Sequence, residues 1–194
     1  MKISKSKLNT YRKCPRQFQY IYVDKIPSEP NDFMQLGLDV HANAESIGRR
    51  LKDFENITRD DVLQAFEDCY IESDFDISEH MTFLFDFFIA TIVDGDYTIF
   101  SIEDRIEDEE TGIRGIVDII LEDPIDNELI VIDYKTSKSK AITDYRLELC
   151  MYKKLVESKY DGRTVSSACI FFTKDGKYKG FNFVETQLKG AYVT

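Results

Sequence analysis

Acidic side chains stand in two short segments that otherwise read as apolar β-strands. Asp118 interrupts the segment Gly115–Leu121, and Asp133 ends the next one, two residues before Lys135. Side chains on a strand alternate between two faces, so Asp133 and Lys135 point to the same face. If the strands pair through the turn at 122–128, Asp118 lies beside Asp133, and two such carboxylates repel unless a cation separates them. The pattern indicates a Mg²⁺ or Mn²⁺ site beside a lysine that can orient water or neutralise a phosphate.

A purely structural interpretation of these residues stays open at this point. Asp-x-Lys tripeptides arise by chance, and acids at strand ends often pair with a neighbouring lysine without any chemistry. On that view Lys135 simply neutralises Asp118 or Asp133.

The surrounding sequence predicts helices in the first half of the chain and a sheet in the second. Apolar residues at helical spacing predict helices over residues 4–13, 15–22, 32–51, 58–69 and 78–92. Short β-branched runs predict strands over 98–106, 114–121, 129–135, 165–173 and 178–184, with a helix over 141–159. Short turns favour an antiparallel arrangement of the first three strands, and the strand after the helical crossover is expected to run parallel to a neighbour. We therefore expect an α+β fold with a mixed sheet in a single domain, 1–194, mainly helical over 1–95 and sheet-bearing over 96–194.

Composition excludes several classes of protein. The chain has 194 residues, only four cysteines and no run of about 18 apolar residues, so neither a disulfide scaffold nor a membrane span is expected. The basic N-terminus lacks the apolar region of a signal peptide, and we expect a cytoplasmic protein without membrane contact.

Charge is divided unevenly along the chain. The net charge is −11, yet residues 1–20 hold six lysines and arginines and no acid. Arg12, Lys13 and Arg16 can contact phosphates, and the ring of Tyr20 can stack on a base, which suits nucleic-acid binding. A solvated basic helix is the alternative interpretation of the same segment.

Five motifs, in order, resemble the RecB-type branch of the PD-(D/E)XK nuclease superfamily. They are an N-terminal signature at Leu8–Tyr20, a G-x-x-x-H motif at Gly37–His41, G-x-x-D at Gly115–Asp118, D-Y-K-T at Asp133–Thr136, and the tyrosine of Q-x-x-x-Y at Tyr152. The resemblance covers most of the chain and implies a restriction-endonuclease-like core with a mixed central sheet.

The resemblance also implies a role for individual residues. It implies metal ligation by His41, Asp118, Asp133 and the carbonyl of Tyr134. It implies a catalytic set of Asp118, Asp133, Lys135 and Tyr152, and it marks Glu103 and Glu148 as candidates for supporting positions around the metal. Glu148 departs from the family pattern, which has glutamine there. Two alternatives stay open: a hydrogen-bonded near-core role for His41 and a surface-acid role for Glu103.

The function implied is that of a Mg²⁺- or Mn²⁺-dependent DNA exonuclease acting on single-stranded ends, with any helicase or other DNA-processing partner supplied by a separate protein. The alternative is a catalytically weak nuclease fold that binds DNA or a protein partner, and an unrelated α+β interaction protein is a third. Some relatives, the CRISPR-associated RecB-like exonucleases among them, hold an iron–sulfur cluster on four cysteines. Only Cys14 matches that pattern here, so no cluster is expected.

Overall fold

The computed structural model describes residues 2–27 and 29–183. The helices are α1 (Lys5–Lys13), α2 (Pro15–Phe18), α3 (Asp32–Lys52), α4 (Arg59–Cys69), α5 (Ser78–Phe88) and α6 (Arg146–Lys159). Short helical turns of other types follow α2 (Gln19–Val23), follow α5 (Ile89–Val93) and precede α6 (Ile142–Asp144). The strands are β1 (Thr98–Asp108), β2 (Ile113–Glu122), β3 (Leu129–Lys135), β4 (Val165–Phe172) and β5 (Lys177–Asn182). Each predicted element is present, with ends that shift by a few residues.

Local sequence signals explain where the main helices begin. The Ser4 side chain caps α1 by accepting a hydrogen bond from the backbone N–H of Lys7, and Asn31 caps α3 in the same way. Thr58 and Asp61 form a reciprocal capping box at the start of α4. These caps satisfy backbone donors that the first helical turn leaves free.

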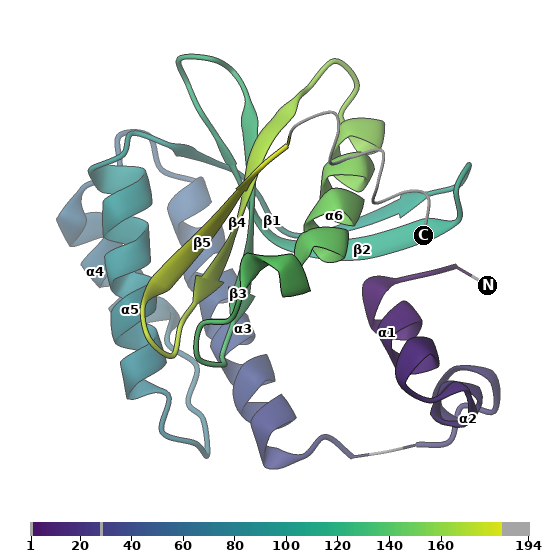
Figure 1. The fold of residues 1–194 in the computed structure, drawn as a ribbon. Coiled ribbons are helices and arrows are strands. Elements are labelled where there is room, and N and C mark those ends of the chain that lie inside the picture. Colours follow the sequence, from purple (N-terminus) through teal and green to yellow (C-terminus); the bar gives the residue numbers. More distant parts are fainter. Residues whose placement is uncertain (1, 28, 184–194) are drawn as a thin grey trace.

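The strands form one sheet in the order β1-β2-β3-β4-β5 (Figure 1). The first three pair antiparallel, β3 and β4 pair parallel after the crossover through α6, and β5 returns antiparallel along β4. The predicted mixed sheet and its strand directions are confirmed.

Helices cover both faces of this sheet. One core packs α3, α4 and α5 against one face, around Phe87, Phe88 and Phe171. The second core packs α6 against the other face, around Leu149, Leu155 and Phe172. The α+β class expected from the sequence is confirmed, with helices on each side of the sheet (Figure 1).

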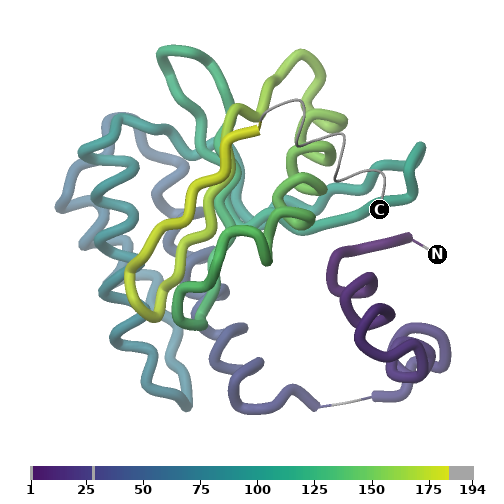
Figure 2. Tube along the Cα trace, viewed as in Figure 1, coloured from purple at the N-terminus to yellow at the C-terminus, as the bar shows by residue number. Residues whose placement is uncertain are grey.

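The N-terminal helices lie near α6 and not near the helices of the other core. Figure 2 shows that the chain of α1 and α2 runs beside the β1–β2 hairpin and α6, away from α4 and α5. Ile3 forms a parallel bridge with Ile113 through two hydrogen bonds, Ile3 N–H to the Gly112 carbonyl and Arg114 N–H to the Ile3 carbonyl, each 2.8 Å. The N-terminal segment therefore adds to the part of β2 that β3 does not reach.

Phe33, in the first turn of α3, is exposed although it is aromatic: 86% of its surface is accessible. Within the described ranges, no helix has both the length and the apolar character needed to cross a membrane.

Candidate metal centre and active site

An irregularity in β1 turns an acidic side chain toward α3. Ile102 packs in the core beside α3, whereas Ile106 packs in the core beside α6, although residues four apart on a regular strand share a face. Glu103 lies between them with a positive φ of 45°, a conformation that side chains other than glycine seldom adopt. The alternation of faces therefore breaks at or next to Glu103.

In the neighbouring strand β2, the alternation of side chains between the two faces also breaks, at Asp118. Val117 packs beside α6 and Ile119 beside α3, so the faces of β2 change across Asp118. The register pairs Ile102 with Ile119 and continues past this point, which sets Glu103 opposite Asp118. Two coincident irregularities thus bring two acids from adjacent strands together.

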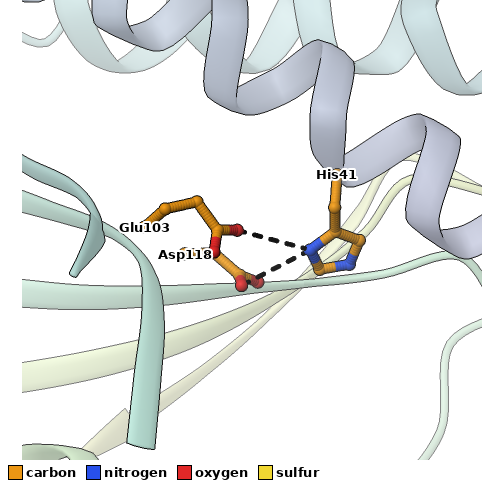
Figure 3. A group of neighbouring side chains, drawn as sticks. All are labelled: His41, Glu103 and Asp118. Carbon is orange, nitrogen blue, oxygen red and sulfur yellow. Dashed lines mark ion pairs between the residues drawn. The ribbon is translucent and has the colours of Figure 1, made fainter. Parts of the chain in front are cut away.

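His41 of α3 reaches these two acids. Its Nδ1 lies 3.4 Å from Asp118 Oδ1 and 3.9 Å from Glu103 Oε1, as the dashed lines in Figure 3 mark. One ligand atom from each of the three residues lies within 4.8 Å of the others, a spacing compatible with a single metal ion. Burial alone lowers the pKa of His41, but the carboxylates of Asp118 and Glu103 outweigh it and raise this pKa to about 10.

The second acid of the sequence pattern lies where β2 and β3 separate. The β2–β3 ladder ends at Ile119 and Ile132, one step before Asp118 would pair with Asp133. Instead, the backbone N–H of Tyr134 donates a 2.6 Å hydrogen bond to Asp118 Oδ2. The side chain of Asp118 is thereby fixed between the two strands. Its burial acts to raise its pKa, but the charge of His41 and this hydrogen bond lower it overall.

Asp133 and Lys135 share one face of β3, as the strand period predicts. This face lies toward α6. Lys135 forms an ion pair with Asp133, and Tyr152 donates a 3.3 Å hydrogen bond to Asp133 Oδ1. Glu148 Oε1 lies 3.6 Å from Lys135 Nζ. Burial, opposed by Lys135 but reinforced by the charges of Asp118 and Glu148, raises the pKa of Asp133 to about 7.

The charges of this site fit a divalent cation. Glu103, Asp118, Asp133 and Glu148 bring four carboxyl groups together, and the lysines paired with them are Lys135 and Lys5. Asp118, Asp133 and Glu148 are buried, so their mutual repulsion is screened less than at a surface. One imidazole nitrogen with carboxylate oxygens is a donor set that Mn²⁺ accepts readily and Mg²⁺ accepts as well.

The structure assembles most of the predicted site residues. His41, Glu103 and Asp118 form the group with metal-ligand spacing, and this group includes Glu103 but not Asp133. Asp133 stands with Lys135, Glu148 and Tyr152. The side chain of Tyr134 is buried in the core beside α3. The predicted metal ligand at this position is the backbone carbonyl of Tyr134, not its side chain.

The predicted DNA-binding residues lie on a separate surface. Arg12, Lys13, Arg16 and Tyr20 are all exposed, and Arg16 Nε donates a 2.7 Å hydrogen bond to the Tyr20 hydroxyl. The four cysteines belong to different parts of the fold: Cys14 precedes α2, Cys69 ends α4, and the others lie in α6 and β4. The absence of an iron–sulfur cluster remains a prediction.

A cavity of about 370 Å³ adjoins the Asp133 side of the site. Tyr152 and Glu148 border it, and its other lining residues include Lys5, Arg105 and Arg114. Lys5 belongs to the basic N-terminal segment that the sequence singled out for phosphate contacts. Sequence reasoning did not find Arg105 and Arg114, because they belong to no motif and meet Lys5 only through the packing of the N-terminal segment beside the β1–β2 hairpin.

Comparison with known proteins identifies the family. The family model of the PD-(D/E)XK nuclease superfamily matches residues 2–190, almost the whole chain. A comparison with curated protein sequences finds no match. The matched range includes all five motifs, the mixed sheet and both groups of acidic residues, and the fold is the restriction-endonuclease-like α+β fold. The chain therefore belongs to the PD-(D/E)XK nuclease superfamily.

Proposed function

We propose that this nuclease is a divalent-metal-dependent exonuclease of the RecB-type branch that degrades single-stranded DNA from its ends. The observation that carries the proposal is the meeting of His41, Glu103 and Asp118 within 4.8 Å, next to the ion pair of Asp133 and Lys135. Family membership supports nuclease chemistry and a divalent metal. The five ordered motifs support the RecB-type assignment.

We assign the metal to His41, Asp118 and Glu103, with Asp133 and the Tyr134 carbonyl as the further ligands that the motif resemblance implies. A bound Mg²⁺ or Mn²⁺ supplies Lewis acidity and a water molecule of lowered pKa. His41 must be neutral to ligate, so metal binding displaces the proton that its acidic neighbours otherwise stabilise.

The remaining residues orient the reactants and compensate charge. The Lys135 ammonium can hold an attacking water or a phosphate oxygen, because it lies on the same face as Asp133 and is fixed by it. Tyr152 holds the other oxygen of Asp133 and so fixes the direction of that carboxylate. These groups provide positioning and electrostatic stabilisation of a phosphate transition state, which carries more negative charge near the metal than the substrate does.

Substrate binding is assigned to the basic N-terminal surface. Arg12, Lys13 and Arg16 offer phosphate contacts, and Tyr20 offers a ring for stacking. The acidic remainder of the chain disfavours DNA elsewhere. We place the enzyme in the cytoplasm, with strand separation left to a partner helicase or another DNA-processing protein.

Metal binding and cleavage test the proposal together. Titration of Mn²⁺ followed by calorimetry should show one site in the wild-type protein and none in His41→Gln. His80→Gln is the matched control, because His80 is the chain's other histidine and lies outside the site, hydrogen-bonded to Thr173. Linear single-stranded DNA should be shortened from an end, while circular single-stranded DNA stays intact.

Two results would contradict the proposal. Cleavage of the circular substrate would show an endonuclease, and equal Mn²⁺ affinity in the wild type and His41→Gln would move the metal elsewhere. A protein that binds DNA but neither binds metal nor cleaves would instead be the catalytically weak binding module.

A further inference from the structure

A series of partly buried charged side chains connects Lys5 of the N-terminal segment to the active site. Its Nζ lies 2.5 Å from Glu148 Oε2, while the other oxygen of Glu148 lies 3.6 Å from Lys135 Nζ. Lys135 in turn pairs with Asp133. The charges of these four side chains therefore alternate in sign along the path from the N-terminal helix to the catalytic aspartate: Lys5, Glu148, Lys135 and Asp133.

The surroundings make these contacts strong. The side chains of Glu148 and Asp133 are 7% and 3% exposed, and those of Lys5 and Lys135 are 20% and 25% exposed. The ring of Tyr145 lies beneath both lysines, 5.6 Å from Lys5 Nζ and 5.8 Å from Lys135 Nζ. Solvent screens the attraction between these partly buried charges less than it would between fully exposed charges. The ring of Tyr145 attracts both ammonium groups as well.

We propose that Lys5 is a positioning residue for Lys135: it neutralises one oxygen of Glu148 and so leaves the catalytic lysine free to stay with Asp133. This inference rests on the proposed function only for its effect on catalysis. Without Lys5, the full charge of the buried Glu148 carboxylate acts on Lys135 and draws it away from Asp133. The N-terminal segment thus completes the active site electrostatically, although Lys5 itself does not touch the three residues with metal-ligand spacing.

The segment is held in place by contacts that are independent of Lys5. Ile3 bridges to β2, and Lys2 forms ion pairs with Glu107 and Glu109 on the β1–β2 hairpin. Lys2→Gln therefore provides the matched control, because it weakens the same docking without removing charge from the site.

Four variants test the proposal: Lys5→Gln, Glu148→Gln, the double variant of both, and Lys2→Gln. Lys5→Gln should lower kcat on single-stranded DNA about tenfold, which is within the range of coupling between neighbouring charged groups, and change KM by less than about threefold. Because Glu148→Gln removes the charge that Lys5 compensates, the double variant should recover kcat to within about threefold of Glu148→Gln alone. Lys2→Gln should keep kcat within about twofold of the wild type.

A spectroscopic measurement tests the same coupling without activity. The ¹⁵Nζ resonance of Lys135, assigned by its loss in Lys135→Arg, should shift in Lys5→Gln, have the same position in the double variant as in Glu148→Gln alone, and stay unchanged in Lys2→Gln. A Lys135 resonance that does not move in Lys5→Gln, or a double variant whose kcat lies more than about threefold below that of Glu148→Gln alone, would overturn the proposal. If the wild-type protein cleaves no DNA, the proposed exonuclease function fails, while the resonance still decides whether Lys5 acts on Lys135.

Discussion

At the scale of single residues, Asp133 is a buried acid whose surroundings disfavour its charge. It is buried, it accepts a hydrogen bond from Tyr152, and it pairs with Lys135. Its pKa is raised to about 7, primarily by burial, with Asp118 and Glu148 adding to the effect against Lys135. A carboxylate kept in surroundings that disfavour its charge contributes little to folding, which supports the role proposed for Asp133 in the chemistry of the site.

Asp133→Asn should separate activity from stability. Asparagine keeps the shape and can still accept the Tyr152 hydrogen bond, but it loses the charge that binds metal and holds Lys135. Cleavage should fall at least about 100-fold, while the free energy of unfolding, measured with urea without added metal, should stay within about 1 kcal/mol because repulsion from Asp118 and Glu148 is relieved. Lys135→Ala should also abolish cleavage. Activity within about tenfold of wild type in both variants would refute the roles assigned to these residues.

At the scale of elements, the site depends on how closely α6 approaches β2. A Cβ at Gly115 would lie 2.9 Å from Leu155 Cδ1, too close for the present packing, and 3.1 Å from Tyr152 Cε1, a tight contact. Glycine at this position of the G-x-x-D motif therefore lets α6 bring Tyr152 to Asp133. Gly115 contributes to the site by having no side chain, which leaves room for Tyr152 and Leu155 of α6.

Gly115→Ala should reduce cleavage by displacing Tyr152. The added methyl group overpacks the contact with α6 and should cost about 1–3 kcal/mol of stability. Gly180→Ala is the control, since Gly180 also lies in a strand and a Cβ there meets nothing within 4 Å. Activity assays and urea unfolding of both variants check this expectation, which is wrong if the two substitutions behave alike.

The contact between α5 and the end of β4 gives a pH-dependent stability. His80 is buried with Nδ1 2.8 Å from Thr173 Oγ1, and burial together with the charge of Lys174 lowers its pKa. In the unfolded chain a histidine titrates near pH 6.5. As the pH falls below that value, the unfolded chain takes up a proton that the folded protein resists, so the free energy of unfolding should decrease.

His80→Gln isolates this contribution. The variant should lose less stability than the wild type between pH 7.5 and pH 5.5 in urea unfolding, because its side chain does not titrate. His41 and the carboxyl groups are the same in both proteins and cancel in the comparison. Identical losses in the two proteins would show that His80 is protonated as easily in the fold as in the unfolded chain.

At the scale of the whole molecule, charge is segregated in space as well as in sequence. The basic residues of this segment, from Lys2 to Arg16, lie just before α1 and within α1 and α2, which run beside the β1–β2 hairpin and away from α4 and α5 (Figure 1). The rest of the chain is strongly acidic. A basic surface on an acidic protein directs a polyanion toward that side of the molecule.

Neutralising that surface should weaken DNA binding without altering the metal site. The triple variant Arg12→Ala/Lys13→Ala/Arg16→Ala should reduce the slope of log affinity against log salt concentration by about 2, since each contact with single-stranded DNA contributes about 0.7. Arg49→Ala/Arg50→Ala/Lys52→Ala removes the same charge from the end of α3 and is the control. Fluorescence anisotropy across a salt series measures both, and an unchanged slope in the first variant would place the DNA elsewhere.

The sequence by itself determined the elements, the mixed sheet and the shared face of Asp133 and Lys135. Helical and strand periods, caps and turn residues are local properties, so they can be predicted from neighbours in the chain. Only the tertiary structure decided that Glu103 joins His41 and Asp118, because the breaks in strand alternation at Glu103 and Asp118 depend on how β1 and β2 pair. It also decided that Glu148 faces Lys5, a pair 143 residues apart that no local pattern indicates. Contacts of that separation arise from packing of the whole chain, where burial and compensating charge act together.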